Sequence, residues 1–237
     1  MALANSHRNS SQNRLLAALP SEQYQTLLPK LTRVSFDIKE ILYDVDQPIS
    51  HVYFPLSGVI SLVSETNKDI VEVATVGNEG FVGLPVFLGS DKTTIKAFSQ
   101  IPGESLKMTS ADFKAEVKRE SALLELLHLY TQALLNQMAQ SAACNRAHSI
   151  EQRCARWLLM CDDRVGGIDF SLTQEFLGQM LGVRRPQVSK VASRLQKAGL
   201  IRYSRGQVAI IDRQKLQGAT CECYKIVQDE YNRLLGD

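Results

Sequence analysis

The sequence predicts an α+β fold in three parts: an N-terminal antiparallel β-roll, a long dimerisation helix and a C-terminal winged helix-turn-helix. Three observations predict it. Short β-prone runs fill residues 32–108, a helical pattern follows, and two helical segments joined by a glycine precede a β-hairpin. The expected divisions are a disordered tail at 1–12, the β-roll domain with flanking helices at 13–117, the dimerisation helix at 118–147, and the winged helix-turn-helix domain with a C-terminal helix at 148–237.

The first part has the pattern of a small β domain. Residues 1–12 are polar and rich in Ser and Asn, which is typical of a disordered terminus. Helical patterns follow at 12–18 and, capped by Ser21, at 22–28. Short β-prone runs then alternate with Gly, Pro, Asn and Asp, which favours an antiparallel sandwich or roll. The runs are Thr32–Phe36, Val52–Pro55, Gly58–Val63, Ile70–Val76, Thr94–Ser99 and Ser105–Met108.

The middle part is helical. Ser110 is the expected N-cap of a helix over 111–118, and a long helix runs from about Ser121 to Ala147. Its apolar residues cover more of the circumference than one roll can bury, and Leu and Ala at three-four spacing suit a parallel coiled pair. We therefore predict a homodimer through residues 121–147. The apolar residues are Leu123, Leu124, Leu127, Tyr130, Leu134, Leu135, Met138, Ala142 and Ala143.

The segment from Thr173 to Ser193 reads as a helix-turn-helix. Gly178 stands where a larger side chain would keep two crossed helices apart, and Gly182 stands where the turn needs a positive φ. Pro186 suits the start of the second helix, near Arg185, because its fixed φ fits and its missing amide needs no partner there. The positions that pack the two helices together are apolar: Leu177, Leu181, Val183, Val188 and Val191.

The exposed face of the second helix carries side chains that reach phosphates and base edges in a major groove. Two amphipathic helices joined by a glycine also occur in proteins that do not bind nucleic acid. The distribution of charge favours the DNA-binding interpretation. From Arg184 to Lys215 there are nine basic residues and one acidic residue, in a chain with 27 basic and 25 acidic residues overall. The expected DNA-contacting residues are Thr173, Arg184, Arg185, Gln187, Ser189, Lys190, Arg194 and Arg205.

The flanks of this segment fit the same interpretation. An amphipathic helix is expected over 149–161, before the helix-turn-helix. After it, two β-prone runs within 200–211 are separated by Ser204-Arg205-Gly206, which predicts a hairpin. Such a hairpin beside a recognition helix is a wing, and Arg205 at its tip could meet a phosphate. Asp212 is the expected cap of a last helix that runs to Leu235.

The composition, 44% hydrophobic and 22% charged over 237 residues, is that of a soluble globular protein. The first residues hold no apolar run long enough for a signal peptide, and no later stretch would span a membrane, so a cytoplasmic location is expected. The five cysteines show no CxxC spacing, which favours reduced, buried thiols and no metal site. Cys221 and Cys223 are the one close pair, and their role is left open.

A roll, a long dimer helix and a winged helix-turn-helix, in this order, resemble the Crp/Fnr family of bacterial transcription regulators. The resemblance covers nearly the whole chain. Its most specific part runs from Leu172 through Val191, Leu195 and Gly199 to Asp212. Gly77–Gly83 is similar to the turn that leads into the family's effector pocket. The resemblance implies a cyclic-nucleotide-binding-like roll, binding of double-stranded DNA as a homodimer, and RNA polymerase as a further partner.

The chain departs from the cyclic-nucleotide-binding members of that family. Their ribose-binding acid corresponds here to Leu84 and their phosphate-binding arginine to Thr93, so the strongest phosphate ligand is missing, and Lys92 or Lys96 would replace it only loosely. An oxygen-sensing iron-sulfur cluster would need N-terminal cysteines, yet the first is Cys144. Haem is disfavoured as well, because the four histidines are scattered.

The recognition helix also differs, because many members carry a glutamate where this chain has Pro186. The leading hypothesis is a dimeric, sequence-specific transcription regulator on a near-palindromic site, with a degenerate effector domain. The alternative is an allosteric sensor in which an unidentified metabolite in the roll controls DNA binding. An enzyme is the third option and is disfavoured, because no catalytic triad order, paired-carboxylate motif, phosphate loop or H-E-x-x-H motif is present.

Overall fold

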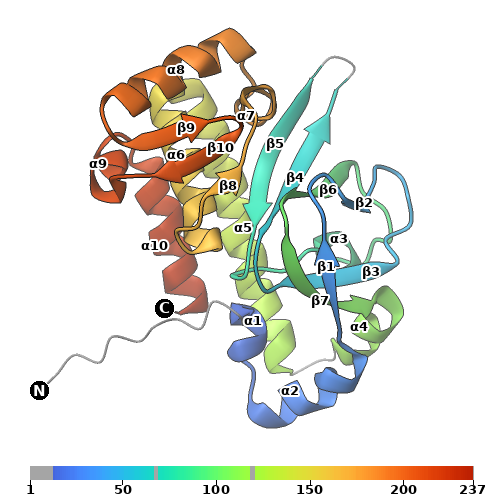
Figure 1. Ribbon diagram of the computed structural model, residues 1–237. Coiled ribbons are helices and arrows are strands. Elements are labelled where there is room, and N and C mark those ends of the chain that lie inside the picture. The colour runs from blue at the N-terminus through green and yellow to red at the C-terminus, as the bar shows by residue number, and fades with distance from the viewer. Residues whose placement is uncertain (1–12, 67–68, 118–120, 237) are drawn as a thin grey trace, which may run out of the picture.

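A computed structural model describes residues 13–66, 69–117 and 121–236. The expected tail, 1–12, lies outside the described residues. Figure 1 shows the β-roll beside a C-terminal domain, with the long helix α5 running past both. The last helix, α10, lies along α5 and returns the C-terminus to the vicinity of the first helix. Within the described part of the chain, no helix is long and apolar enough to cross a membrane.

Two antiparallel sheets form the roll. One has the order β1-β7-β3 and the other β2-β6-β4-β5. Large apolar side chains fill the space between them, with Phe54, Phe81 and Phe113 almost fully buried and in ring contact. The strands are β1 (Thr32–Phe36), β2 (Ile41–Tyr43), β3 (His51–Pro55), β4 (Val59–Glu65), β5 (Ile70–Val76), β6 (Ile95–Ile101) and β7 (Gly103–Thr109).

All six β-prone runs form strands close to their expected bounds. Strand β2 was not predicted; it has three residues and a shifted register against β6. The short helix α3 (Leu84–Phe87) was not predicted either, because its four residues are too few for a periodic pattern. A further two-residue strand, β8 (Phe170–Ser171), joins the C-terminal domain by pairing with the wing.

The short helices around the roll confirm the helical patterns but correct two caps. They are α1 (Arg14–Ala17), α2 (Ser21–Leu27), the 3-10 turn η1 (Leu28–Lys30) and α4 (Ser110–Glu116). Ser21 is the first residue of α2 and follows Pro20 at the cap position, so it does not cap the helix. Ser110 likewise lies inside α4, because the hydroxyl of Thr109 accepts from the backbone N–H of Asp112 and takes the cap position.

The long helix α5 (Ala122–Ala147) begins after Ser121, whose side chain caps it as the sequence indicates. One face packs on the roll through Leu123, Leu127, Tyr130 and Leu134, all buried. The C-terminal domain follows. It comprises α6 (Ile150–Val165), α7 (Gln174–Leu181), α8 (Arg185–Lys197), β9 (Ile201–Ser204), β10 (Gln207–Ile210), α9 (Arg213–Gly218) and α10 (Cys223–Leu235).

The expected single last helix is wrong in one respect. Asp212 caps α9 by accepting from the backbone N–H of Lys215, but α9 ends at Gly218 and a separate helix, α10, begins at Cys223. The break at residues 219–222 turns the chain back along α5. It also brings Cys221 and Cys223 to the end of α5, a placement that a continuous helix would not give.

Candidate nucleic-acid interface

The helix-turn-helix is built as the sequence predicts. Thr173 caps α7, because its hydroxyl accepts from the backbone N–H of Phe176 at 3.1 Å. Gly182 ends α7 with a φ of +61°, in the left-handed region that favours glycine. A Cβ on Gly178 would stand 2.8 Å from the carbonyl oxygen of Val183, so only glycine lets the turn approach α7 this closely.

The wing is an antiparallel hairpin of β9 and β10, with Arg205 and Gly206 at its tip at φ +50° and +76°. Positive φ at both central residues is the two-residue turn whose twist matches paired strands. Two hydrogen bonds fix the wing to the helices. The Tyr203 hydroxyl donates to the Leu172 carbonyl at 2.6 Å, and the Gln196 side chain of α8 accepts from the Tyr203 N–H at 2.7 Å.

A hollow of about 650 Å³ opens between α8 and the wing. Four of the expected DNA-contacting residues line it: Thr173, Arg185, Ser189 and Arg205. The other lining residues were not predicted from the sequence, although those on α8 follow Ser189 at helical spacings of three, four and seven. The additional residues are Gln174, Glu175, Ala192, Ser193, Gln196, Tyr203 and Gly206.

The other four expected contact residues are also exposed but lie outside this hollow. Arg184 and Lys190 project from the start and the middle of α8. Gln187 is partly occupied, because its side chain accepts from the backbone N–H of Arg184 at 3.1 Å and helps to start the helix. The guanidinium of Arg194 lies 3.4 Å from the carboxylate of Glu151 on α6. The structure therefore spreads the expected set over two sides of α8.

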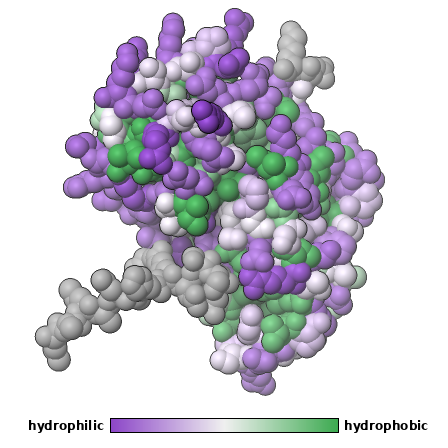
Figure 2. All heavy atoms as spheres, viewed as in Figure 1, coloured by the Kyte–Doolittle hydropathy of each residue, from purple (hydrophilic) through white to green (hydrophobic). Residues whose placement is uncertain are grey.

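Most cations of this surface are available to an external anion. Among the described residues, Arg184, Arg185, Lys190 and Arg205 have no carboxylate within ion-pair distance, although all four are exposed. Figure 2 shows hydrophilic residues gathered over the end of the molecule that α8 forms. Unpaired arginines and lysines on a protruding helix and wing are suited to the phosphates of a duplex, which neutralise them without competing internal acids.

The C-terminal domain docks on the roll through polar contacts that are buried. On β5, the carboxylate of Glu72 accepts from the indole N–H of Trp157 on α6 at 2.8 Å and from the hydroxyl of Ser61 at 2.6 Å. The amide of Gln100 donates to the sulfur of Cys161 at 3.2 Å. Burial raises the pKa of Glu72 to about 7, although the hydrogen bonds from Ser61 and Trp157 oppose that shift.

This raised pKa predicts that the junction weakens as the pH rises. The folded-state pKa of Glu72 lies above its ordinary value of 4.5, so its contribution to stability is complete below that value and is lost progressively as the pH rises from there through 7. Glu72→Gln keeps the hydrogen bonds without the charge. We expect it to raise the Tm at pH 8, by about 2–4 °C for each kcal/mol gained in stability, and to leave the Tm at pH 4 nearly unchanged. Equal shifts at both pH values would contradict this explanation.

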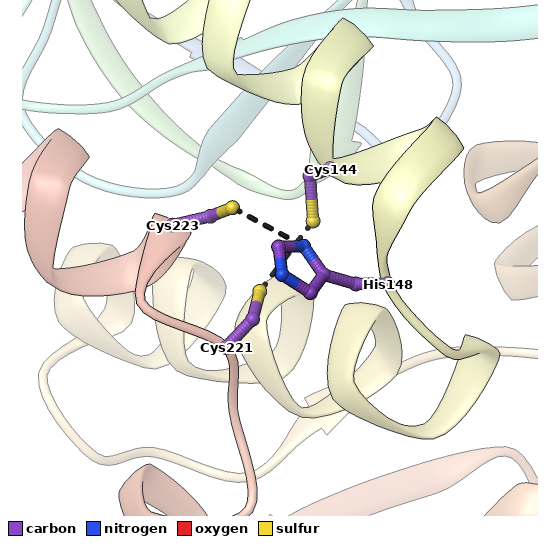
Figure 3. A group of neighbouring side chains, drawn as sticks. All are labelled: Cys144, His148, Cys221 and Cys223. Carbon is purple, nitrogen blue, oxygen red and sulfur yellow. Dashed lines mark hydrogen bonds between the residues drawn. The ribbon is translucent and has the colours of Figure 1, made fainter.

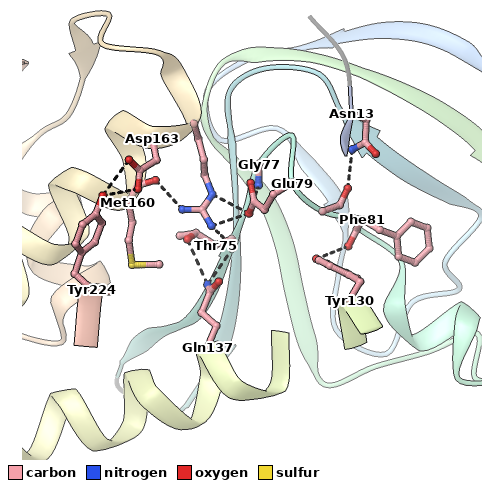
Figure 4. Close-up of polar contacts among 12 residues, drawn as sticks. Asn13, Thr75, Gly77, Glu79, Phe81, Tyr130, Gln137, Met160, Asp163 and Tyr224 are labelled. Atoms are coloured by element: carbon pink, nitrogen blue, oxygen red, sulfur yellow. Dashed lines mark hydrogen bonds and ion pairs between the residues drawn. The ribbon is translucent and has the colours of Figure 1, made fainter. Parts of the chain in front are cut away.

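The glycine-rich turn 77–83 lies where the roll, α5 and α6 meet (Figure 4). The carboxylate of Glu79 accepts from Arg164 of α6 at 2.7 Å, and the hydroxyl of Tyr130 on α5 donates to the carbonyl of Phe81 at 2.9 Å. A Cβ on Gly80 would stand 2.8 Å from the Tyr130 ring, so the close approach requires glycine. The turn thus connects all three parts of the molecule.

Comparison with known proteins agrees with this architecture. A family model described as a Crp-like helix-turn-helix domain matches residues 152–219. The chain is similar to the transcriptional regulatory protein btr of Bordetella pertussis, with 26% identity over 192 residues that span 76% of this chain and 77% of btr.

Two solved structures share the fold. FixK2 from Bradyrhizobium japonicum superposes with a TM-score of 0.68 at 19% identity, covering 81% of this chain and 98% of FixK2. A transcriptional regulator of the Crp/Fnr family from Eubacterium rectale superposes with a TM-score of 0.67 at 15% identity, covering 86% of this chain and 96% of that one. The chain therefore resembles regulators of the Crp/Fnr family in fold, and residues 152–219 match a Crp-like helix-turn-helix domain.

The comparisons confirm the expected fold class and the expected kind of function. The chain is a Crp/Fnr-like transcription regulator with a helix-turn-helix DNA-binding domain. The structure also places two residues named in the comparison with cyclic-nucleotide-binding members. Leu84 packs against the core at the start of α3, and Lys96 is held by the carboxylates of Glu65 at 2.6 Å and Asp44 at 3.2 Å.

Proposed function

We propose that this regulator acts as a homodimer on a near-palindromic DNA site, with α8 of each protomer in successive major grooves roughly 34–36 Å apart. The observation that carries the proposal is the hollow between α8 and the wing, lined by Arg185 on one side and Arg205 on the other. Arg185 stands at the first residue of α8, where side chains of a recognition helix contact base edges. Arg205 at the wing tip is placed for a phosphate of the adjoining backbone.

These two arginines are expected to differ when replaced. Arg185→Ala should cost roughly 1–3 kcal/mol on the preferred site and relax the base preference at one position, because a bidentate contact to guanine is lost. Arg205→Ala should weaken binding to all sequences alike, and it should reduce the slope of log affinity against log salt concentration by about one. Selection from random oligonucleotides, followed by titrations at several salt concentrations, measures both.

The matched control is Lys225→Ala, which removes an exposed cation of α10 that lies outside the hollow. It should leave affinity and base preference unchanged. An Arg185→Ala protein that selects the same sequences with the same affinity as the parent would overturn the assignment of α8 as the base-reading helix.

The homodimer is supported by the face of α5 that points away from the roll. Leu135 is 56% exposed, and Ala139, Ala142 and Ala143 on the following turns are exposed as well. Leu129 adds a further half-exposed apolar side chain one to two turns earlier. A stripe of this kind on a long helix is buried when a second copy packs against it, and the small alanines allow two helix axes to approach closely.

For the roll, we favour a degenerate effector domain. A cyclic nucleotide would need an acid for its ribose and a guanidinium for its phosphate, but this chain offers Leu84 and Thr93 at those positions. Lys96 cannot substitute without leaving Glu65 and Asp44. The ring of His128 packs on Phe87 with centroids 5.3 Å apart, an arrangement that gives no support to a haem ligand.

The alternative is that an unidentified metabolite in the roll controls DNA binding. The buried junction through Glu72 and Glu79 favours it, because a ligand that shifts either contact would reorient the DNA-binding domain. A thermal-shift screen that includes cyclic AMP and cyclic di-GMP tests this, since a bound ligand raises the Tm. DNA affinity that stays the same with and without every stabilising compound would leave the roll as a scaffold. Contact with RNA polymerase is proposed from family resemblance alone.

A further inference from the structure

Four potential metal ligands meet at the end of the long helix (Figure 3). Cys144 and His148 come from the last turn and the C-cap of α5, whereas Cys221 and Cys223 come from the start of α10. Their ligand atoms all lie within 4.8 Å of one another. The Sγ atoms of Cys144 and Cys221 are 3.5 Å apart, and the Sγ of Cys223 is 3.4 Å from Nδ1 of His148.

These separations suit one tetrahedral ion. With zinc–sulfur bonds of about 2.3 Å, the ligands of a tetrahedral site stand about 3.8 Å apart, within the range that the four atoms span. The 3.5 Å between Cys144 and Cys221 is far longer than the roughly 2.05 Å of a disulfide, so both thiols are reduced. Cys144 and His148 are four residues apart on a helix, which places them on one face.

Polar groups next to the four residues contact the candidate ligands, as the groups that hydrogen-bond to metal ligands do in metal sites. The carboxylate of Glu222 lies 3.2 Å from Nε2 of His148, so a proton on Nε2 leaves the lone pair of Nδ1 directed at the sulfurs. The side-chain amide of Gln140 donates to the sulfur of Cys223 at 3.0 Å. Both contacts would strengthen the binding of a metal ion. Neither contact is needed if the neutral thiols simply pack against one another.

The cluster is also separate from the main core. Cys144, Cys221 and Cys223 are buried against one another and apart from the continuous apolar cluster. Arg156 of α6 lies close enough to Cys144 to favour a negative charge on its sulfur. A bound cation deprotonates its thiol ligands, and the nearby guanidinium of Arg156 offsets the surplus negative charge of three thiolates on a divalent ion.

We propose that Cys144, His148, Cys221 and Cys223 bind one zinc ion in a closed structural site. Three sulfurs and one imidazole nitrogen in a tetrahedron are a ligand set that zinc prefers, and four protein ligands leave no open position for a substrate. The site fastens the start of α10 to the end of α5, next to the connection between α5 and α6. Zinc therefore helps to fix the orientation of the DNA-binding domain relative to α5.

This inference does not depend on the DNA contacts proposed above. It revises the expectation that the cysteines form no metal site, which rested on the absence of a CxxC spacing. Cys221 lies before α10 and its cap residue Glu222, and the sulfurs of both cysteines lie within reach of one ion. The other two ligands are more than 70 residues away in the sequence.

Metal analysis of the full-length protein tests the proposal. Protein purified without chelator under reducing conditions should contain about one zinc per chain by inductively coupled plasma mass spectrometry. Cys221→Ser and Cys223→Ser should lose most of that zinc. Cys154→Ser is the matched control, because Cys154 is equally buried but lies outside the cluster, and it should keep its zinc. Glu222→Gln should retain the site but weaken zinc affinity about 10–100-fold.

A second measurement covers variants that fail to fold. Apo protein prepared with a chelator and titrated with Co²⁺ should develop thiolate-to-cobalt charge-transfer bands and the intense visible bands of a tetrahedral site, and both should disappear when zinc is added. The proposal is overturned if the parent protein holds no stoichiometric metal and shows no cobalt bands, or if Cys221→Ser binds zinc as tightly as the parent. A disulfide between Cys144 and Cys221 in parent protein purified under reducing conditions would also overturn the proposal.

Discussion

Leu135→Asp is expected to produce a monomer that binds its DNA site about 10²–10⁴-fold more weakly than the parent. Leu135 is the most exposed large apolar residue of α5, so an aspartate there disturbs few contacts of the single chain. In the proposed dimer it would place two carboxylates in an apolar seam. Without the partner, the second half-site no longer benefits from a high effective concentration, and most of the affinity is lost.

Analytical ultracentrifugation at micromolar concentration and titration of a two-half-site duplex measure the two effects together. Ile38→Asp is the matched control, because Ile38 is 49% exposed in the loop between β1 and β2 and lies outside α5. It should stay dimeric. A Leu135→Asp protein that remains dimeric and keeps the parent's DNA affinity would show that the exposed stripe of α5 is not the dimer contact.

The parts of the fold that follow a local rule could be predicted from the sequence. Gly178 and Gly182 identify the turn because Gly178 allows the close approach of the next helix and Gly182 adopts a positive φ. The six strands could be found because Gly, Pro, Asn and Asp interrupt the β-prone runs between them. The caps at Ser110 and Ser21 were misplaced by one residue, since Thr109 and Pro20 can end the preceding segment equally well.

Features that depend on distant residues could not be predicted in this way. The hollow of the nucleic-acid interface includes Glu175 of α7 and Tyr203 of β9, which adjoin α8 only after the two helices cross and the wing folds back. The Cys144 cluster depends on a helix break at 219–222 that has no proline and follows a single glycine, Gly218. From the sequence, Glu79 is recognisable only as part of a glycine-rich turn. Its partner Arg164 lies in another domain, and no periodicity connects them.

The contact between Glu79 and Arg164 is expected to be among the most consequential in the molecule. Their side chains are only 9% and 7% exposed, and the guanidinium also donates to the carbonyls of Met160 at 2.6 Å and Thr75 at 3.3 Å. Burial opposes the charge of Arg164, but the carboxylate of Glu79 holds its pKa above the ordinary value. A guanidinium has an ordinary pKa above 12, so Arg164 stays charged when Glu79 is replaced.

Glu79→Gln should lower the free energy of unfolding by roughly 3–5 kcal/mol, because it leaves a buried guanidinium without a counter-charge. The double variant Glu79→Leu with Arg164→Met should recover most of that loss, since it removes both charges and keeps the volume filled. Urea unfolding measures both. Glu104→Gln is the control: it breaks the exposed pair with Arg33 and should leave the midpoint unchanged.

The same variants separate stability from control of the DNA-binding domain. If the pair only stabilises the fold, the double variant should bind DNA as the parent does. If the pair also fixes the domain's orientation through the turn 77–83, the double variant should be stable but should bind the two-half-site duplex more weakly, with single half-site affinity unchanged. A Glu79→Gln protein as stable as the parent would contradict both readings, because it would mean that Arg164 finds another counter-charge at the junction of roll, α5 and α6.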